Sequence, residues 1–143
     1  MVRYYSDDGV FDGPVQKVWR LIEAHGERLA EIHPNVVSHK GIPQADGSTR
    51  LDVVTRMPDG TKVGHTWRIL FRPPYSQIIE ILDGPLKGSW MTITYVPEGN
   101  RTRAVTVSEY RVQGVTDEST LQKMAQEYFD GAYDEDARFL KML

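Results

Sequence analysis

The chain ends on the segment ESTLQKMAQEYFDGAYDEDARFLKML, residues 118–143, and this segment decides the fold class. It contains no proline, and its apolar residues recur at spacings of three, four and seven, which places them on one face of a helix. These residues are Leu121, Ala125, Tyr128, Ala132, Phe139 and Leu143. A helix of about 26 residues is roughly 39 Å long at 1.5 Å per residue, longer than packing in a small domain requires. We therefore expect it to lie across a curved sheet and to enclose a cavity with it.

The part of the chain before this helix has the alternating pattern of β-strands. Strands are expected at residues 2–11, 36–42, 49–57, 61–72, 76–83, 88–96 and 102–113. Short turn sequences such as Pro58-Asp59-Gly60 separate successive strands, which predicts an antiparallel meander. Between the first two strands, the segments PVQKVWRLI and ERLAEI predict two short helices with a break at His25-Gly26. Residues 1–143 are expected to form a single domain of α+β class.

Composition and charge exclude several classes of protein. The absence of cysteine rules out disulfides, thiolate catalysis and cysteine-based metal sites. A net charge of -3, with scattered basic residues, argues against a nucleic-acid partner. No apolar run reaches the length of a membrane span, and the first residues lack the apolar core of a signal peptide. We therefore expect a cytoplasmic protein without stable membrane insertion.

Strand register predicts which side chains face the cavity. A turn at residues 58–60 places Val53 opposite His65 and Leu51 opposite Trp67, and the next strand turns Ile79 and Ile81 inward. In the last hairpin, pairing Tyr95 with Thr102 gives a partly polar inner face, formed by Met91, Ile93, Tyr95, Thr106, Ser108 and Tyr110. The outer face then carries Trp90, Val105 and Val107, which makes a homodimer contact one interpretation of that face.

Three short motifs carry a family resemblance. They are PVQKVW at residues 14–19, IHP at residues 32–34 and DGPLKG at residues 83–88. In this order and spacing they resemble the SRPBCC superfamily, which includes START domains, birch-pollen-allergen-like proteins and polyketide cyclases. The resemblance is to the polyketide cyclase/dehydrase-like branch. It implies a helix-grip fold: a curved antiparallel sheet of about seven strands around a long C-terminal helix, with two short helices between strands 1 and 2. It also implies a mostly apolar cavity, but no common active site.

His65 is the leading candidate for chemistry, because it lies on an apolar strand face between Val63 and Trp67. An inward histidine can donate or accept a proton near neutral pH. In one register Asp83 lies opposite His65 and fixes its tautomer. Tyr110 is the third candidate for proton transfer. The alternative interpretation of His65 is a hydrogen-bonded residue with a structural role only.

The expected ligand-binding residues combine apolar walls with a few polar groups, as orientation of a small amphipathic ligand requires. They are His65, Trp67, Ile79, Ile81, Met91, Ile93, Ser108, Tyr110 and Tyr128. Packing in the core is the alternative role for each apolar member. No metal site and no cofactor are expected, because His25, His33 and His39 follow no HxxH or HExxH spacing and are assigned to different elements. The acidic residues of the last helix are interpreted as a solvated face.

Two functions remain open from the sequence. The first is binding or carriage of a small hydrophobic or aromatic molecule, such as a lipid, quinone or polyketide-like ring. The second is a cyclase, aromatase or dehydratase reaction in which His65 and a tyrosine, or Asp83, transfer protons. A protein-interaction module is a weaker third reading. The same inner face serves the first two functions, so the residues do not separate them.

Overall fold

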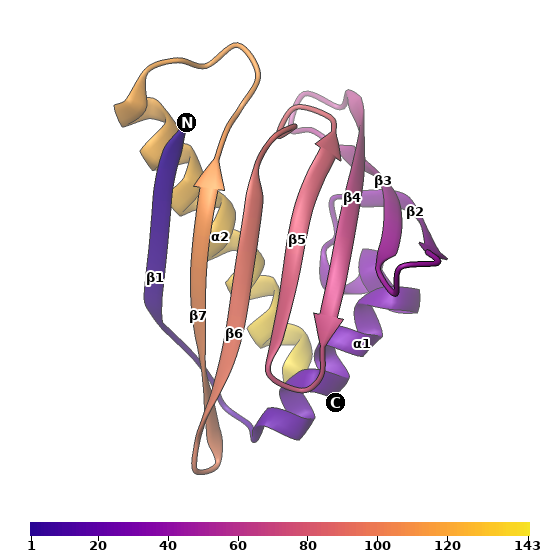
Figure 1. Ribbon diagram of the computed structural model, residues 1–143, viewed down its shortest axis with the longest axis vertical. Helices are drawn as coiled ribbons and strands as arrows, with labels where there is room; N and C mark the ends of the chain where they lie inside the picture. Colours follow the sequence, from indigo (N-terminus) through magenta and orange to yellow (C-terminus); the bar gives the residue numbers. More distant parts are fainter.

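The computed structural model describes all residues, 1–143, and has the expected α+β architecture. One seven-stranded antiparallel sheet is made of β1 (Val2–Phe11), β2 (Val36–Pro43), β3 (Thr49–Arg56), β4 (Lys62–Arg72), β5 (Ser76–Asp83), β6 (Trp90–Glu98) and β7 (Arg101–Tyr110). The helices are α1 (Val15–Ile32) and α2 (Glu118–Leu140). The strand order is β1-β7-β6-β5-β4-β3-β2, so β2 to β7 form the meander and β1 pairs with β7 at one edge (Figure 1).

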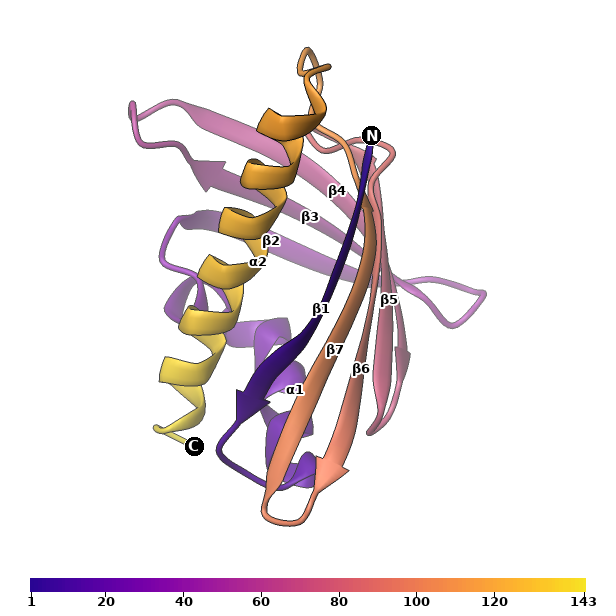
Figure 2. The same ribbon diagram turned by 90° about the vertical axis from the view of Figure 1, so that its left-hand side faces the viewer.

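Helix α2 crosses one face of the curved sheet, and α1 lies against the C-terminal half of α2 on the same side (Figure 2). Asp117 caps α2, because its carboxylate accepts a hydrogen bond from the backbone N–H of Thr120 at 2.8 Å. Leu121, Ala125 and Phe139 of the predicted apolar face are buried. Leu143 lies beyond the end of the helix and is 39% exposed, so its predicted place on that face was wrong. Neither helix combines the length and the hydropathy needed to cross a membrane.

Helix α1 consists of two helical stretches, as the sequence predicted, but the break between them falls at a different residue. The segment is one element with a kink at Arg28, whose backbone angles (φ -113°, ψ 26°) are not helical. The break thus falls two residues after Gly26, which stays inside the helix and does not cap it. The guanidinium of Arg28 lies 4.7 Å from the centre of the Phe139 ring, a cation–π contact that ties the kink to α2.

The strand registers agree with the sequence except at the last hairpin and at the end of the β4–β5 pair, where Asp83 lies opposite Thr66. Val53 pairs with His65 and Leu51 with Trp67, as expected. In the β6–β7 hairpin Tyr95 pairs with Ala104, and not with Thr102. The loop has two residues, with Gly99 first at φ 65°, as in a type II′ turn, where the expected loop had four. This shift by two residues preserves the alternation of side chains, so the same residues still face inward.

Two apolar clusters fill the space between the sheet and the helices. One joins β3, β4 and β5 to the N-terminal half of α2 and includes Ile79, Ile81 and Leu121. The other joins α1 to the C-terminal end of α2 and to β6, and centres on Trp19 and Phe139. Between these clusters, α2 lies above β1, β6 and β7, and this region contains the candidate site.

Candidate functional site

A cavity of about 360 Å³ lies between α2 and the strands β1, β6 and β7. Its volume is within the range of small-molecule sites. Its lining residues are Tyr4, Ser6, Asp8, Gly9 and Phe11 of β1, Ile93 and Tyr95 of β6, Ala104 and Thr106 of β7, and Phe129, Asp130, Ala132, Tyr133, Asp134 and Asp136 of α2. Eight of these fifteen residues are hydrophobic. The sequence therefore predicted the position of the cavity correctly, between the sheet and the last helix.

Aromatic pairs shape this cavity. Tyr4 stacks on Phe129 with ring centres 4.5 Å apart, and Phe11 packs against Tyr133 at 5.0 Å. The Tyr133 hydroxyl donates a hydrogen bond of 2.6 Å to the carbonyl of Val10. A bulge interrupts β1 before Gly9, and a side chain at that position would begin 3.2 Å from the Tyr133 ring. The missing side chain at residue 9 thus allows Tyr133 to reach across to the strand.

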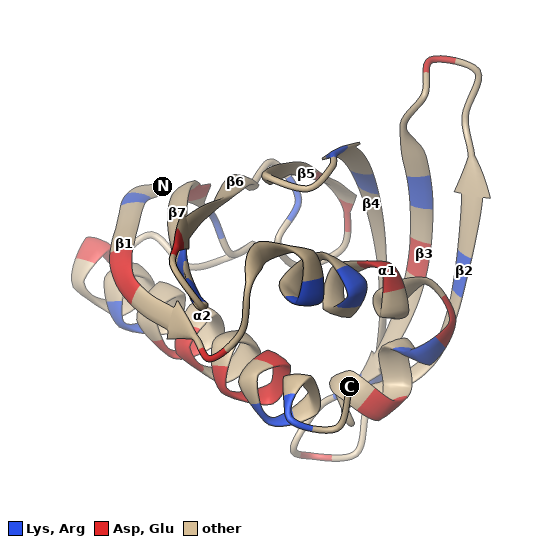
Figure 3. Cartoon of the chain, turned by 90° about the horizontal axis from the view of Figure 1, so that it is seen from below, with Lys and Arg blue, Asp and Glu red and all other residues tan.

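The charges around the cavity have one sign. Four carboxylates, Asp8, Asp130, Asp134 and Asp136, line it, and no Lys or Arg does. Acidic residues recur along α2, as Figure 3 shows. A carboxylate or phosphate group of a ligand would be repelled here, whereas a neutral or cationic ligand would not.

The predicted ligand-binding residues divide between the cavity and the core. Ile93 lines the cavity. The apolar residues Ile79, Ile81 and Met91 are at most 6% exposed and belong to the core cluster under α2. Ser108 is 1% exposed, and its hydroxyl donates to the carbonyl of Trp90 at 2.8 Å, so this hydroxyl is already partnered. Sequence reasoning missed the α2 and β1 residues of the cavity, since it assigned the inner face strand by strand.

His65 is held by Thr55, and not by Asp83. Its Nε2 lies 3.0 Å from the hydroxyl oxygen of Thr55, and its Nδ1 is buried without a partner. Asp83 pairs with Thr66, because the register shifts between Thr66 and Trp67, so the expected pairing of Asp83 with His65 was wrong. Gly84 covers Nδ1: a side chain there would begin 3.1 Å from this atom. Burial lowers the pKa of His65, which favours the neutral ring.

Tyr110 at the end of β7 and Tyr128 of α2 lie together, with ring centres 5.8 Å apart. Burial raises the pKa of Tyr110 to about 12 and raises that of Tyr128 as well, so both hydroxyls are neutral at physiological pH. The indole Nε1 of Trp67 is buried without a hydrogen-bond partner. It shares the inner face of β4 with His65, two residues away, so this face carries two unpartnered buried nitrogens.

A second hollow, of about 510 Å³, spans β2, β3 and β4. Paired residues of its lining, such as Ser38 with Val54 and Val54 with Gly64, lie on the face of the sheet opposite to buried Val53. The hollow exists in part because Gly64 has no side chain. Its lining also includes His65 and Asp83, but α2 does not contribute to it. We therefore take the cavity under α2 as the candidate site.

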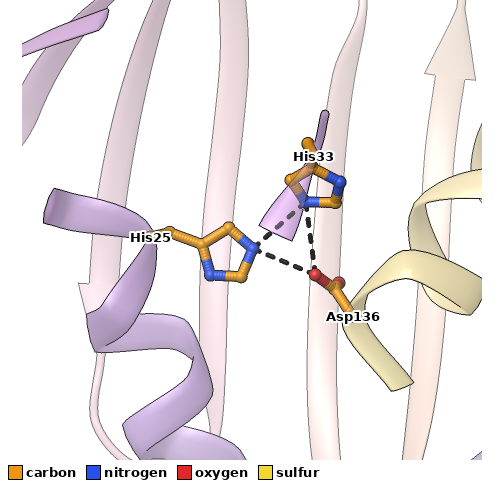
Figure 4. A group of neighbouring side chains, drawn as sticks. All are labelled: His25, His33 and Asp136. Atoms are coloured by element: carbon orange, nitrogen blue, oxygen red, sulfur yellow. Dashed lines mark hydrogen bonds and ion pairs between the residues drawn. The ribbon is translucent and has the colours of Figure 1, made fainter. Parts of the chain in front are cut away.

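One group of polar side chains adjoins that cavity through Asp136, which lines it. The His25 Nε2 lies 3.0 Å from Asp136 Oδ1, the His33 Nε2 lies 3.2 Å from the same oxygen, and the two Nε2 atoms are 3.2 Å apart (Figure 4). His25 lies in the helical stretch before the kink of α1 and His33 at the end of the stretch after it, on separate stretches as expected, yet their side chains meet. The acidic residues of α2 were expected to form a solvated face, but the side chain of Asp136 is only 19% exposed.

Protonation in this group reflects the ion pairs. Burial alone raises the pKa of Asp136, but the hydrogen bonds from His25 and His33 outweigh it and the pKa lies below the ordinary value. Burial lowers the pKa of His33, yet Asp136 and Glu135 together raise it above the ordinary value. The carboxylate is therefore ionised, and the group attracts positive charge.

Comparison with known proteins agrees with this architecture. A family profile described as "Polyketide cyclase / dehydrase and lipid transport" matches residues 7–142. No curated protein sequence matches the chain.

Solved structures with this fold include aromatase/cyclases. The di-domain ARO/CYC StfQ from the steffimycin biosynthetic pathway is similar at a TM-score of 0.77 and 14% identity, over 99% of this chain and 50% of that one. The chain thus spans about half the length of StfQ. The Zhui aromatase/cyclase of a Streptomyces species is similar at a TM-score of 0.71 and 13% identity, over 97% of this chain and 89% of that one.

A START superfamily protein from Mycobacterium smegmatis gives a TM-score of 0.77 at 13% identity, covering 99% of this chain and 97% of that one. At such identities the likeness shows the fold alone. The helix-grip architecture and the match over nearly the whole chain lead to one conclusion: this chain belongs to the polyketide cyclase/dehydrase and lipid transport family of the SRPBCC superfamily.

Proposed function

We propose that the protein binds a small aromatic or other largely apolar molecule, neutral or cationic, in the cavity under α2. The observation that carries this proposal is the cavity of about 360 Å³, with its apolar lining and its two aromatic pairs. Burial of apolar ligand surface contributes about 25 cal/mol per Å², which supplies the affinity. The four carboxylates, with no Lys or Arg among the lining residues, select against anionic ligands.

Binding is favoured over proton transfer by the placement of His65. The enzymatic alternative requires His65 within hydrogen-bond reach of a substrate and of a tyrosine or Asp83. Its Nε2 is instead bonded to Thr55, and the backbone of Gly84 lies over its Nδ1. His65 does not line the cavity under α2.

The test compares three naphthalene derivatives that differ in charge: naphthol, naphthylmethylamine and naphthoate. Calorimetric titration should show binding of the neutral and cationic probes. The anion should bind about tenfold more weakly, because like charges about 8 Å apart repel by about 1–2 kcal/mol at an intermediate dielectric constant. Equal binding of all three probes would contradict the proposed charge selection.

A pair of variants locates the site. Ala104→Phe places a ring in the cavity and should abolish binding, because Ala104 lines it. Val105→Phe, one residue further along β7, changes the outer face and should leave binding intact. Both variants should keep the circular dichroism spectrum of the parent protein. Binding that survives Ala104→Phe, or absence of binding for all probes and for a lipid panel, counts against this cavity as the site.

A further inference from the structure

Three ligand atoms converge where α1 meets α2. They are His25 Nε2, His33 Nε2 and Asp136 Oδ1, and their separations of 3.0, 3.2 and 3.2 Å form a nearly regular triangle. Metal–ligand bonds of about 2.0–2.1 Å place ligand atoms about 2.8–3.0 Å apart at right angles and about 3.3–3.4 Å apart at the tetrahedral angle. The observed triangle lies between these two values. A single ion can therefore reach all three atoms with small side-chain movements.

The remaining ring nitrogens orient both histidines for this role. The His25 Nδ1 is 2.8 Å from the carbonyl oxygen of Leu21, which can only accept a hydrogen bond, so this nitrogen is the donor. The His33 Nδ1 lies 3.0 Å from a carboxylate oxygen of Glu135 and likewise donates. In the neutral rings the lone pairs are therefore on the two Nε2 atoms, which face each other and Asp136. Metal-binding histidines characteristically donate their other N–H to a carbonyl or carboxylate in this way.

Three acceptors at such short distances need a positive charge between them. Two neutral imidazole nitrogens and a carboxylate oxygen repel one another unless a proton or a metal ion lies among them. We propose that His25, His33 and Asp136 form a binding site for a first-row divalent transition metal such as Zn²⁺. Two imidazoles and one carboxylate are a ligand set suited to such ions, and with three protein ligands further positions stay open.

The location allows an ion to enter and to face the cavity. The side chains of His25, His33 and Asp136 are 24%, 17% and 19% exposed, so the group is shielded but not sealed. Asp136 also lines the cavity of about 360 Å³, so an ion here would lie at the cavity wall. Metal binding is independent of the organic ligand proposed above, since none of the three atoms requires that ligand to be present.

The kink in α1 explains why sequence spacing did not reveal the site. In a straight helix, residues 25 and 33 would lie about 12 Å apart along the axis. The non-helical backbone of Arg28 bends the chain between them, and their Nε2 atoms come within 3.2 Å. Asp136 then approaches from a helix more than a hundred residues further along the chain.

Calorimetric titration of chelator-treated protein with ZnCl₂ tests the proposal. We expect one Zn²⁺ per chain, and a rise in the unfolding temperature that depends on Zn²⁺ concentration. His33→Ala and Asp136→Asn should each lower the affinity at least 100-fold and abolish that rise. Glu135→Gln, which alters the positioning residue behind His33, should lower the affinity about tenfold. His39→Ala serves as the control and should bind as the parent protein does, because His39 lies on β2.

Cobalt(II) gives a second readout that does not depend on stability. Its visible spectrum in the parent protein should show the intense bands of a low-coordinate nitrogen and oxygen site, and these bands should vanish in Asp136→Asn. Circular dichroism confirms that each variant is folded, and His33→Gln replaces His33→Ala if the smaller residue unfolds the chain. Absence of saturable binding below about 100 µM overturns the proposal. So does binding that His33→Ala and Asp136→Asn leave unchanged.

Discussion

Substitution of Gly84 by alanine tests the packing above His65. Gly84 has φ 107°, a conformation that residues with a side chain rarely adopt. Its new Cβ would lie 2.8 Å from the carbonyl oxygen of Gly64 and 3.2 Å from the Cα of His65, both in β4. These backbone atoms belong to a paired strand and cannot rotate away as a side-chain tip can. The free-energy cost of Gly84→Ala therefore has two parts, backbone strain of about 1–3 kcal/mol and steric overlap with β4.

Two other glycines separate strain from steric overlap. Gly47 and Gly60 have φ 88° and 87°, but nothing lies within 4 Å of a Cβ at either position. Gly47→Ala and Gly60→Ala should each cost about 1 kcal/mol, since strain is offset in part by the reduced freedom of the unfolded chain. Gly84→Ala should cost about 3–4 kcal/mol, which corresponds to a loss of about 10 °C in unfolding temperature at this chain length. Chemical denaturation of all three variants measures the difference. Equal losses would refute the argument that contact with β4 decides the cost.

Three further predictions concern the core, the cavity wall and pH. Leu121→Ala should cost about 3 kcal/mol, because Leu121 is 1% exposed, whereas Met142→Ala, at 69% exposure, should stay within about 0.5 kcal/mol; urea unfolding compares them. Tyr133→Phe should cost about 1 kcal/mol through loss of the bond to Val10, and an unchanged free energy of unfolding would contradict that role. Because burial lowers the pKa of His65, stability from its neutral ring is present above about pH 6.5 and is lost as the pH falls towards the lower folded-state pKa. The difference in stability between the parent protein and His65→Gln should therefore shrink on acidification. A difference that stays constant with pH would refute this role of His65. The charged or titratable neighbours of His65 along the hollow across β2, β3 and β4 are His39, Lys40, Asp52 and Asp83.

The sheet and its inner face could be predicted from the sequence because both follow from the alternation of apolar and polar residues along each strand. The turn at residues 58–60 fixed the pairing of Leu51 with Trp67, and the hydrophobic pattern then determined the face of every residue in β3 and β4. Even the wrong register of the last hairpin kept Tyr110 inside, because an error of two residues leaves the alternation unchanged.

The site was less accessible, because it depends on where elements distant in sequence meet. The β5 bulge at Leu82, opposite Thr66 and Trp67, leaves no trace in the hydrophobic pattern, yet it moves Asp83 away from His65. The kink at Arg28 likewise brings His33 to His25 without any motif in the sequence. Which residues of α2 line the cavity depends on the rotation of the helix about its own axis above β1. The pattern of apolar residues fixes that rotation only coarsely.

The pairing of β1 with β7 has a consequence for how the protein is made. Val2 pairs with Tyr110, so the first strand finds its partner only after 108 further residues (110 minus 2) have been synthesised. At about 5–20 residues per second, the ribosome needs about 5–20 s to supply that partner. During this interval Tyr4 and Phe11, buried in the finished protein, have neither β7 nor α2 to cover them. The nascent chain therefore exposes these two aromatic residues on an unpaired strand, and a protein truncated before residue 101 would keep β1 without its partner strand.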